Sequence, residues 1–241
     1  MLALWRKEVF ALLHSLIAYL TWAIFLVGTG LFLWVFSGGV IQTGAAEMDA
    51  FFSIAPWFLL FLAPALTMRS FSEEFRTGSY ELLATAPISR WGILLAKYLA
   101  VAAVIGFALV PTGVFYISIS WLAQPRGNID HGAIQGAYVG LFALGLSLSA
   151  LGIWASTLTV HTIIAFLLGL LLGFVWLIGF EFASELPVGR FFQEMLAQLS
   201  LMEHYRSLSR GVLDSRDILY YLSVIAFSLG LAHFQLSRRH P

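Results

Sequence analysis

The stretch TIIAFLLGLLLGFVWLIGF, residues 162–180, contains no charged side chain. A helix that crosses the hydrocarbon core of a bilayer needs about 20 predominantly apolar residues, and this stretch meets that need by itself. Five other stretches are also predominantly apolar: 16–36, 51–68, 93–122, 137–158 and 218–236. The pattern predicts an all-α membrane protein with six transmembrane helices. The third span contains Pro111, which should kink its helix because proline has no amide hydrogen.

The composition of the whole chain agrees with this prediction. Of its 241 residues, 60% are hydrophobic and 11% are charged, whereas soluble domains are about 45–50% apolar and about 25% charged. Intrinsic disorder is excluded because it requires low hydrophobicity. The 13 basic and 13 acidic residues balance, which gives no sign of a nucleic-acid partner. We expect one transmembrane domain over 16–241, whose first span is retained because no small-x-small cleavage site follows it.

The distribution of basic residues predicts the orientation of the chain. Six spans place both termini on one side, and cytoplasmic segments of membrane proteins carry an excess of Lys and Arg. Eight of the 13 basic residues lie on the side of the termini: Arg6, Lys7, Arg69, Arg76, Arg90, Lys97, Arg238 and Arg239. The other five lie opposite: Arg126, Arg190, Arg206, Arg210 and Arg216. We therefore expect both termini to be cytoplasmic.

The N-terminal residues 1–15 have the pattern of an amphipathic helix. Apolar residues recur at spacings of 3, 4, 3 and 4, with charged residues off the stripe. The stripe consists of Leu2, Trp5, Val9, Leu12 and Leu16. Such a helix just before a first span is typical of an elbow that lies in the membrane interface. A plain cytoplasmic extension of the first span is the alternative.

The loop 69–92 between the second and third spans holds most of the acids on the cytoplasmic side. Ser70 and Glu73 have the spacing of a capping box, which predicts a helix start. The sequence Thr77-Gly78-Ser79 should interrupt this helix, and Pro87 should end a second one. We expect four apolar side chains to face the cytoplasm and to favour a docking surface for a soluble partner: Phe71, Phe75, Leu82 and Leu83. An ordinary solvated loop is the alternative.

The longest segment on the outer side, 184–217, contains a second amphipathic pattern. Apolar residues recur at spacings of 4, 3, 4 and 3, which predicts one helix from residue 188 to residue 202: Val188, Phe192, Met195, Leu199 and Met202. Arg206 and Arg210 before Gly211 are typical of a helix C-terminus. The segment either lies on the outer leaflet or re-enters the membrane. If it re-enters, Phe192, Met195 and Leu199 are candidates for an outer gate.

The sequence predicts no catalytic residue, cofactor or metal site. Its two lysines, Lys7 and Lys97, do not follow a glycine, so the Gly-Lys of a nucleotide-binding P-loop is missing. The six histidines include no H-E-x-x-H pair. Ser147 and His161 differ in depth by roughly 15 Å along the spans, which excludes a serine protease pair. A six-span chain without an energy source suits the membrane subunit of a transporter whose ATPase is a separate protein.

The loop between spans two and three also carries a resemblance. Met68-Arg69, followed by EEFRTGSYELLATAP at residues 73–87, resembles the loop of type-2 ABC exporter permeases. Four further stretches resemble the gliding-motility permease subunits of the GldF type: GLFLWVF at 30–36, APWFLLFL at 55–62, GNID at 127–130 and HYRSLSRGVLDSRD at 204–217. The likeness extends over nearly the whole chain.

This resemblance implies an architecture and a set of partners. It implies an elbow helix, a cytoplasmic coupling helix between spans two and three, and re-entrant helices between spans five and six. The partners would be a dimer of cytoplasmic ABC ATPases and a second permease subunit, in the lipid bilayer of a bacterial inner membrane. The coupling role would fall on Glu73, Glu74, Arg76, Gly78, Glu81, Thr85 and Pro87. Ser79 departs from the threonine usual in these permeases.

Two other functions fit the same sequence features. One is a permease that serves the maturation of a periplasmic metalloenzyme, such as a copper site. The other is a membrane scaffold that transmits the motion of an ATPase to a periplasmic partner without moving cargo.

Overall fold

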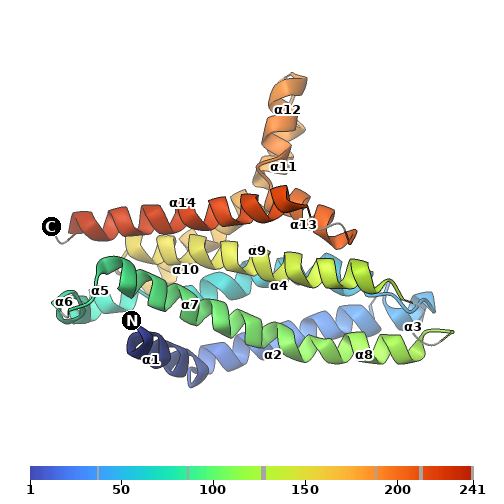
Figure 1. Ribbon diagram of the computed structural model, residues 1–241, viewed down its shortest axis with the longest axis horizontal. Coiled ribbons are helices and arrows are strands. Elements are labelled where there is room, and N and C mark those ends of the chain that lie inside the picture. The colour runs from blue at the N-terminus through green and yellow to red at the C-terminus, as the bar shows by residue number, and fades with distance from the viewer. Residues whose placement is uncertain (37, 86, 126–128, 188, 212–213, 240–241) are drawn as a thin grey trace.

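The computed structural model describes the chain except residues 37, 86, 126–128, 188, 212–213 and 240–241 (Figure 1). The expected outer position of Arg126 and the place of Val188 in the apolar stripe lie outside the described residues, as does the side chain of Arg239. The described residues form helices, turns and bends without a strand.

Within the described residues, six helical segments are long and apolar enough to cross a membrane, as the sequence predicts. The first is α2, Leu16–Trp34, and the second is α4, Asp49–Thr67. The third joins α7, Arg90–Leu109, to α8, Gly113–Leu122, and the fourth is α9, His131–Leu158. The fifth joins α10, Thr162–Phe174, to α11, Phe180–Ser184, and the sixth is α14, Ser215–Arg239.

Two of the spans change helix type along their length. The third passes through a 3-10 turn, Val110–Thr112, which contains Pro111, at the place where the sequence predicts a kink. The fifth passes through a π-helical turn, Val175–Gly179. Turns of this type occur frequently at functional sites, and here the turn comes directly before α11.

The centre of the bundle is α9, which packs against α4, α7, α10, α13 and α14. Glycine residues allow this close packing, since a Cβ at Gly152 would overlap the Thr67 hydroxyl and one at Gly145 would lie 3.0 Å from Ile105. The buried hydroxyl of Ser147 donates to the Ala143 carbonyl of its own helix at 3.1 Å. These contacts agree with a packing role for the small residues of this span.

Shorter helices precede the first span or lie between the spans. The short helices are α1, Leu2–Leu13; α3, Val40–Thr43; α5, Ser72–Thr77; α6, Ser79–Ala84; α12, Arg190–Ala197; and α13, Leu201–Ser209. Both termini lie at the end of the bundle that carries α5 and α6, and α3 lies at the opposite end (Figure 1). This arrangement is the one expected for an even number of spans.

The N-terminal stripe differs from the prediction at both of its ends. Leu2 and Leu16 are 66% and 81% exposed, while Leu4 and Val9 are buried where α1 packs against α7. The reason is that Ser15 caps a new helix, because its hydroxyl accepts a hydrogen bond from the Ile17 amide at 3.2 Å. Leu16 therefore belongs to α2 and cannot continue the stripe of α1.

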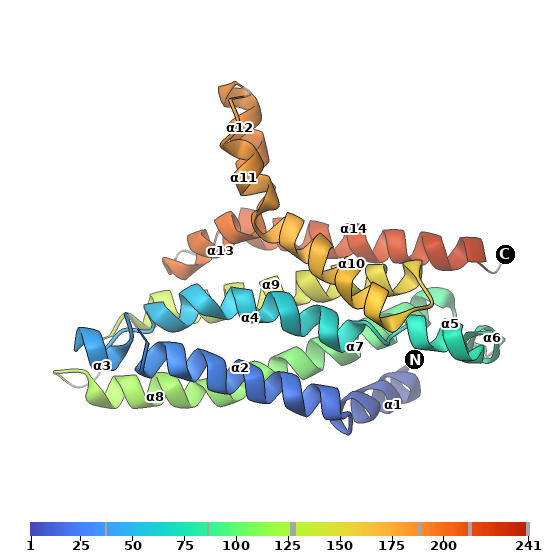
Figure 2. The ribbon, with the colours of Figure 1, turned by 180° about the vertical axis from the view of Figure 1, so that it is seen from behind.

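The predicted outer helix from 188 to 202 is wrong as a single element. It divides into α12 and α13, because Ser200 accepts a hydrogen bond from the Met202 amide at 3.2 Å and starts a second helix. The two halves differ in environment. Figures 1 and 2 show α11 and α12 projecting away from the bundle, while α13 lies against it.

Candidate functional site

The loop between α4 and α7 is folded by a glycine turn. Gly78 has φ of +72°, in the left-handed region that glycine adopts without the steric penalty of a Cβ. The turn ends α5 and begins α6, which confirms the predicted interruption at Thr77-Gly78-Ser79. The first of the two helices begins at Ser72 and not at the predicted Ser70, and the Ser72 hydroxyl donates to the Met68 carbonyl.

Aromatic side chains hold the two short helices together on their inner side. The Phe75 ring lies 5.1 Å from the Tyr80 ring and 6.1 Å from the Phe71 ring, centroid to centroid. Phe71 and Tyr80 are buried, and Phe75 and Leu83 are partly buried against the same cluster, so the expectation that all four apolar side chains of the loop face the cytoplasm is wrong. Leu82 is the exposed apolar residue, at 78%. Burial also raises the pKa of the Tyr80 hydroxyl above its ordinary value, which keeps this group neutral.

The solvent-exposed side of the loop presents most of the predicted coupling residues together. Arg76, Gly78, Glu81, Thr85 and Pro87 are exposed, and Glu73 is partly exposed. Glu73 lies 3.8 Å from Arg69 and 3.5 Å from Arg76. Exposed pairs of this kind contribute about 0–1 kcal/mol, so a partner protein can replace them at little cost. The surface formed by Glu73, Arg76, Gly78, Glu81, Leu82, Thr85 and Pro87 is called the loop surface below.

Glu74 does not belong to the loop surface. Its Oε1 atom lies 2.6 Å from the Lys97 ammonium of α7, and Lys97 is only 3% exposed. The same ammonium lies 3.3 Å from Glu8 of α1. Sequence reasoning missed the roles of Lys97 and Glu8, although a lysine at the start of an apolar span was a signal, because a buried ammonium requires a counter-ion.

Toward the opposite end of the bundle, α13 is the half of the predicted 188–202 helix that is packed into the core. Four of its side chains are buried: Leu201, Met202, Tyr205 and Leu208. The Tyr205 hydroxyl donates to the Phe52 carbonyl of α4 at 2.9 Å, and the Ser200 hydroxyl donates to the Leu177 carbonyl at 2.7 Å. By contrast, Phe192 is 55%, Met195 44% and Leu199 37% exposed, so these three residues do not line the interior of this chain.

Charged side chains fasten α13 to its neighbours. Arg206 donates to Glu181 of α11 at 2.7 Å. One ring nitrogen of His204 lies 2.7 Å from Asp217 of α14, and the other lies 2.9 Å from the Gln198 carbonyl. Both ring nitrogens therefore face an oxygen that accepts hydrogen bonds, one on α14 and one in the turn before α13. His204, Arg206 and Asp217 all lie in the stretch 204–217, which carries part of the resemblance described above.

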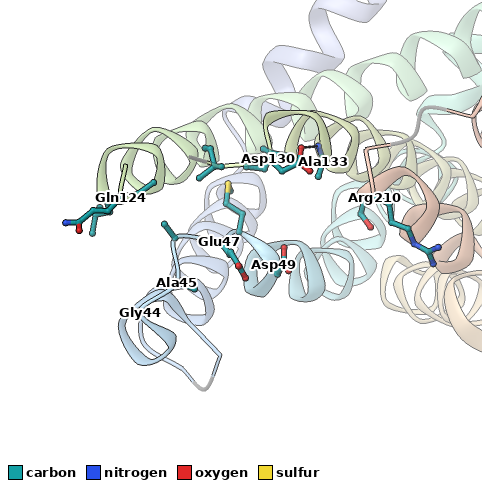
Figure 3. Close-up of a pocket in the computed structure, with 15 residues that line it drawn as sticks. Gly44, Ala45, Glu47, Asp49, Gln124, Asp130, Ala133 and Arg210 are labelled. Carbon is teal, nitrogen blue, oxygen red and sulfur yellow. Dashed lines mark hydrogen bonds between the residues drawn. The ribbon is translucent and has the colours of Figure 1, made fainter. Parts of the chain in front are cut away.

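A polar hollow of about 960 Å³ opens beside α13 at the end of the bundle opposite to the termini (Figure 3). Its lining includes Glu47, Asp49, Asp130 and Arg210. Asp130 also caps α9, because its side chain accepts a hydrogen bond from the Ala133 amide at 2.9 Å. Within the described part of the chain, no group of three or more His, Asp or Glu side chains is arranged to hold a metal ion.

Comparison with known families gives one match that covers most of the chain. The family model described as ABC-2 family transporter protein matches residues 13–234. Comparison with curated proteins gives no match.

Proposed function

Because the chain belongs to the ABC-2 family of transporter proteins, we propose that it is a permease whose partner ATPase docks on the loop surface. Membership of the family makes the chain a multi-pass membrane subunit of a transporter, which associates with an ABC ATPase and with membrane subunits. The site of docking, the direction of transport and the orientation in the membrane are the proposed parts.

The arrangement of the loop between α4 and α7 carries this proposal. The side of the loop that faces the bundle is an aromatic cluster. Its solvent-exposed side presents Glu73, Arg76 and Glu81 beside the exposed Leu82. A polar rim around an apolar residue is typical of a protein-docking surface. The loop surface is also at the same end as both termini (Figure 2), the side that the excess of basic residues predicts to be cytoplasmic.

We further propose that the transporter exports its cargo and that α13 closes its outer end. The buried Met202, Tyr205 and Leu208 replace the exposed residues of α12 as candidates for the outer gate. Opening would require α13 to separate from α4 and α9, which breaks the hydrogen bond from Tyr205 to Phe52. The narrower gliding-motility type rests on the resemblance of residues 204–217 and of the other stretches quoted above.

The test is capture of an ABC ATPase encoded beside this chain, with both proteins co-expressed and the permease purified from membranes. Glu73→Ala with Glu81→Ala should reduce capture at least tenfold, because removing one partner of a desolvated charge pair costs about 2–5 kcal/mol. The outer pair Glu47→Ala with Asp49→Ala is the control and should leave capture unchanged. Wild-type capture by the loop variant would place the ATPase elsewhere.

A further inference from the structure

One buried ammonium connects three separate elements at the end of the bundle that carries the loop surface. The Lys97 ammonium of α7 lies 2.6 Å from Glu74 of α5 and 3.3 Å from Glu8 of α1. The side chains of Glu8 and Glu74 are 15% and 16% exposed, and that of Lys97 is 3% exposed. These three residues are called the Lys97 cluster below.

The Lys97 cluster has more acid than base. Glu8 and Glu74 both contact the Lys97 ammonium, Glu8 also lies 3.3 Å from the exposed Lys7 ammonium, and the Glu74 Oε2 atom is buried without a hydrogen-bond partner among the described residues. The ammonium also lies 5.3 Å from the centroid of the Phe71 ring, which ties it to the aromatic cluster of the loop. A cleft of about 270 Å³ between α1 and the loop borders all three members.

Stability alone does not account for such a cluster. Replacing a buried ion pair by apolar side chains of similar volume is often neutral or stabilising. A buried ion pair does fix the relative position of the elements that carry it, because its short contacts form only in that position. The exposed pairs of Glu73 with Arg69 and Arg76 join residues of one short segment and hold it to no other element.

We propose that Lys97 is the positioning residue of the loop between α4 and α7. It joins α5, α1 and α7 into one body, so that a displacement of the loop moves the third span and the N-terminal helix with it. Without the ammonium, the loop surface could still bind its partner, but its movement would be absorbed between α5 and α7. The transmission of movement rests on the proposed function, whereas the existence of the joint does not.

The joint is tested by distance measurements on the full-length chain in lipid vesicles. The chain has no cysteine, so spin labels at Leu2→Cys and Leu82→Cys report only the distance between α1 and α6. Both positions are exposed, at 66% and 78%. Lys97→Met should broaden the distance distribution about twofold or more, as expected for segments freed to fluctuate against each other. A distribution of wild-type width would overturn the proposal.

Three further variants keep the distance test decisive. Arg6→Met is the control, because Arg6 is an exposed cation of the same helix α1 that lies outside the Lys97 cluster, and it should leave the distribution unchanged. Lys97→Arg keeps the charge and should keep the narrow distribution. If Lys97→Met does not accumulate in membranes, Glu8→Gln replaces it, and the same broadening is expected because only the contact to α1 is weakened.

Transmission is tested in the complex with the ATPase. Lys97→Met should retain capture of the ATPase within about twofold, since the loop surface is unchanged, while transport per ATP hydrolysed falls about fivefold or more, the lower end of typical coupling between sites. Lys97→Arg should restore it. Broadened distances with unchanged transport per ATP would overturn the transmission. If no ATPase binds the wild-type chain, the proposed function fails, and the distance measurement still decides the joint.

Discussion

Glu73 and Glu74 are neighbours in the chain, yet their side chains have opposite surroundings. Glu73 faces solvent beside two arginines, whereas Glu74 contacts the buried ammonium of Lys97. Glu73→Ala should therefore change the free energy of unfolding by less than about 0.5 kcal/mol. Glu74→Ala should lower it by about 2–4 kcal/mol, because it removes one partner of a mostly buried pair. Thermal unfolding of the purified chain in detergent compares the two, and equal losses would contradict the assignment.

A second prediction at this scale concerns the histidine of α13. His204→Leu removes both hydrogen bonds of the ring and leaves the buried Asp217 without its partner. The free energy of unfolding should fall by about 1–3 kcal/mol, the cost of an unsatisfied buried group. His161→Ala is the control, because His161 is exposed at the turn before α10. Unfolding in detergent provides the measurement, and a loss of similar size in the control would refute the stabilising role of the His204 hydrogen bonds.

The neighbours of single residues were the part that the sequence could not predict. Glu73 and Glu74 both lie in an acidic loop, and nothing local distinguishes them. The partner of Glu74 is 23 residues further along the chain, and Lys97, the second partner of Glu8 beside its neighbour Lys7, is on another helix. Contacts over such distances depend on how the helices pack, which one sequence does not contain.

At the scale of the elements, the glycines of α9 set how closely the helices approach. A Cβ at Gly152 would overlap the hydroxyl of Thr67 on α4, while a Cβ at Gly230 of α14 would meet no atom within 4 Å. Gly152→Ala should lower the free energy of unfolding by about 1–3 kcal/mol through overpacking. Gly230→Ala should not lower it, since alanine is the better helix former. Denaturation in detergent compares the two variants. A Gly152→Ala variant with the free energy of unfolding of the wild type would refute the close contact.

The existence of the helices was easier to predict than their ends. The spans followed from apolar length, and the turn at Gly78 followed from its residue type. The apolar stripe from Val188 to Met202 is continuous in sequence, but Ser200 divides it because its hydroxyl caps the following helix and also reaches Leu177. Serine within an apolar stripe is compatible with a helix interior or with a cap, and tertiary contacts decided for the cap.

At the scale of the whole molecule, the fold places the loop surface and the polar hollow at opposite ends of the bundle (Figures 1 and 3). A cysteine in place of Arg76 should be protected from an impermeant thiol reagent in intact cells. A cysteine in place of Glu47, which lines the hollow, should be labelled. The measurement has no background because the chain lacks cysteine. Labelling of Arg76→Cys in intact cells would contradict the predicted orientation and favour the opposite one.

The π-helical turn Val175–Gly179 has a consequence for the length of the chain itself. A turn of this type holds one residue more than an α-helical turn, so it acts as an insertion kept in a single place. Deleting one residue there would return the fifth span to an unbroken α-helix. In a regular α-helical turn the same deletion would rotate everything after it by about 100°, whereas the wide turn already absorbs its extra residue locally. Glu181 would therefore keep the side of the helix from which it contacts Arg206 at 2.7 Å. The fifth span can thus lose one residue at this turn without redirecting the arm formed by α11 and α12.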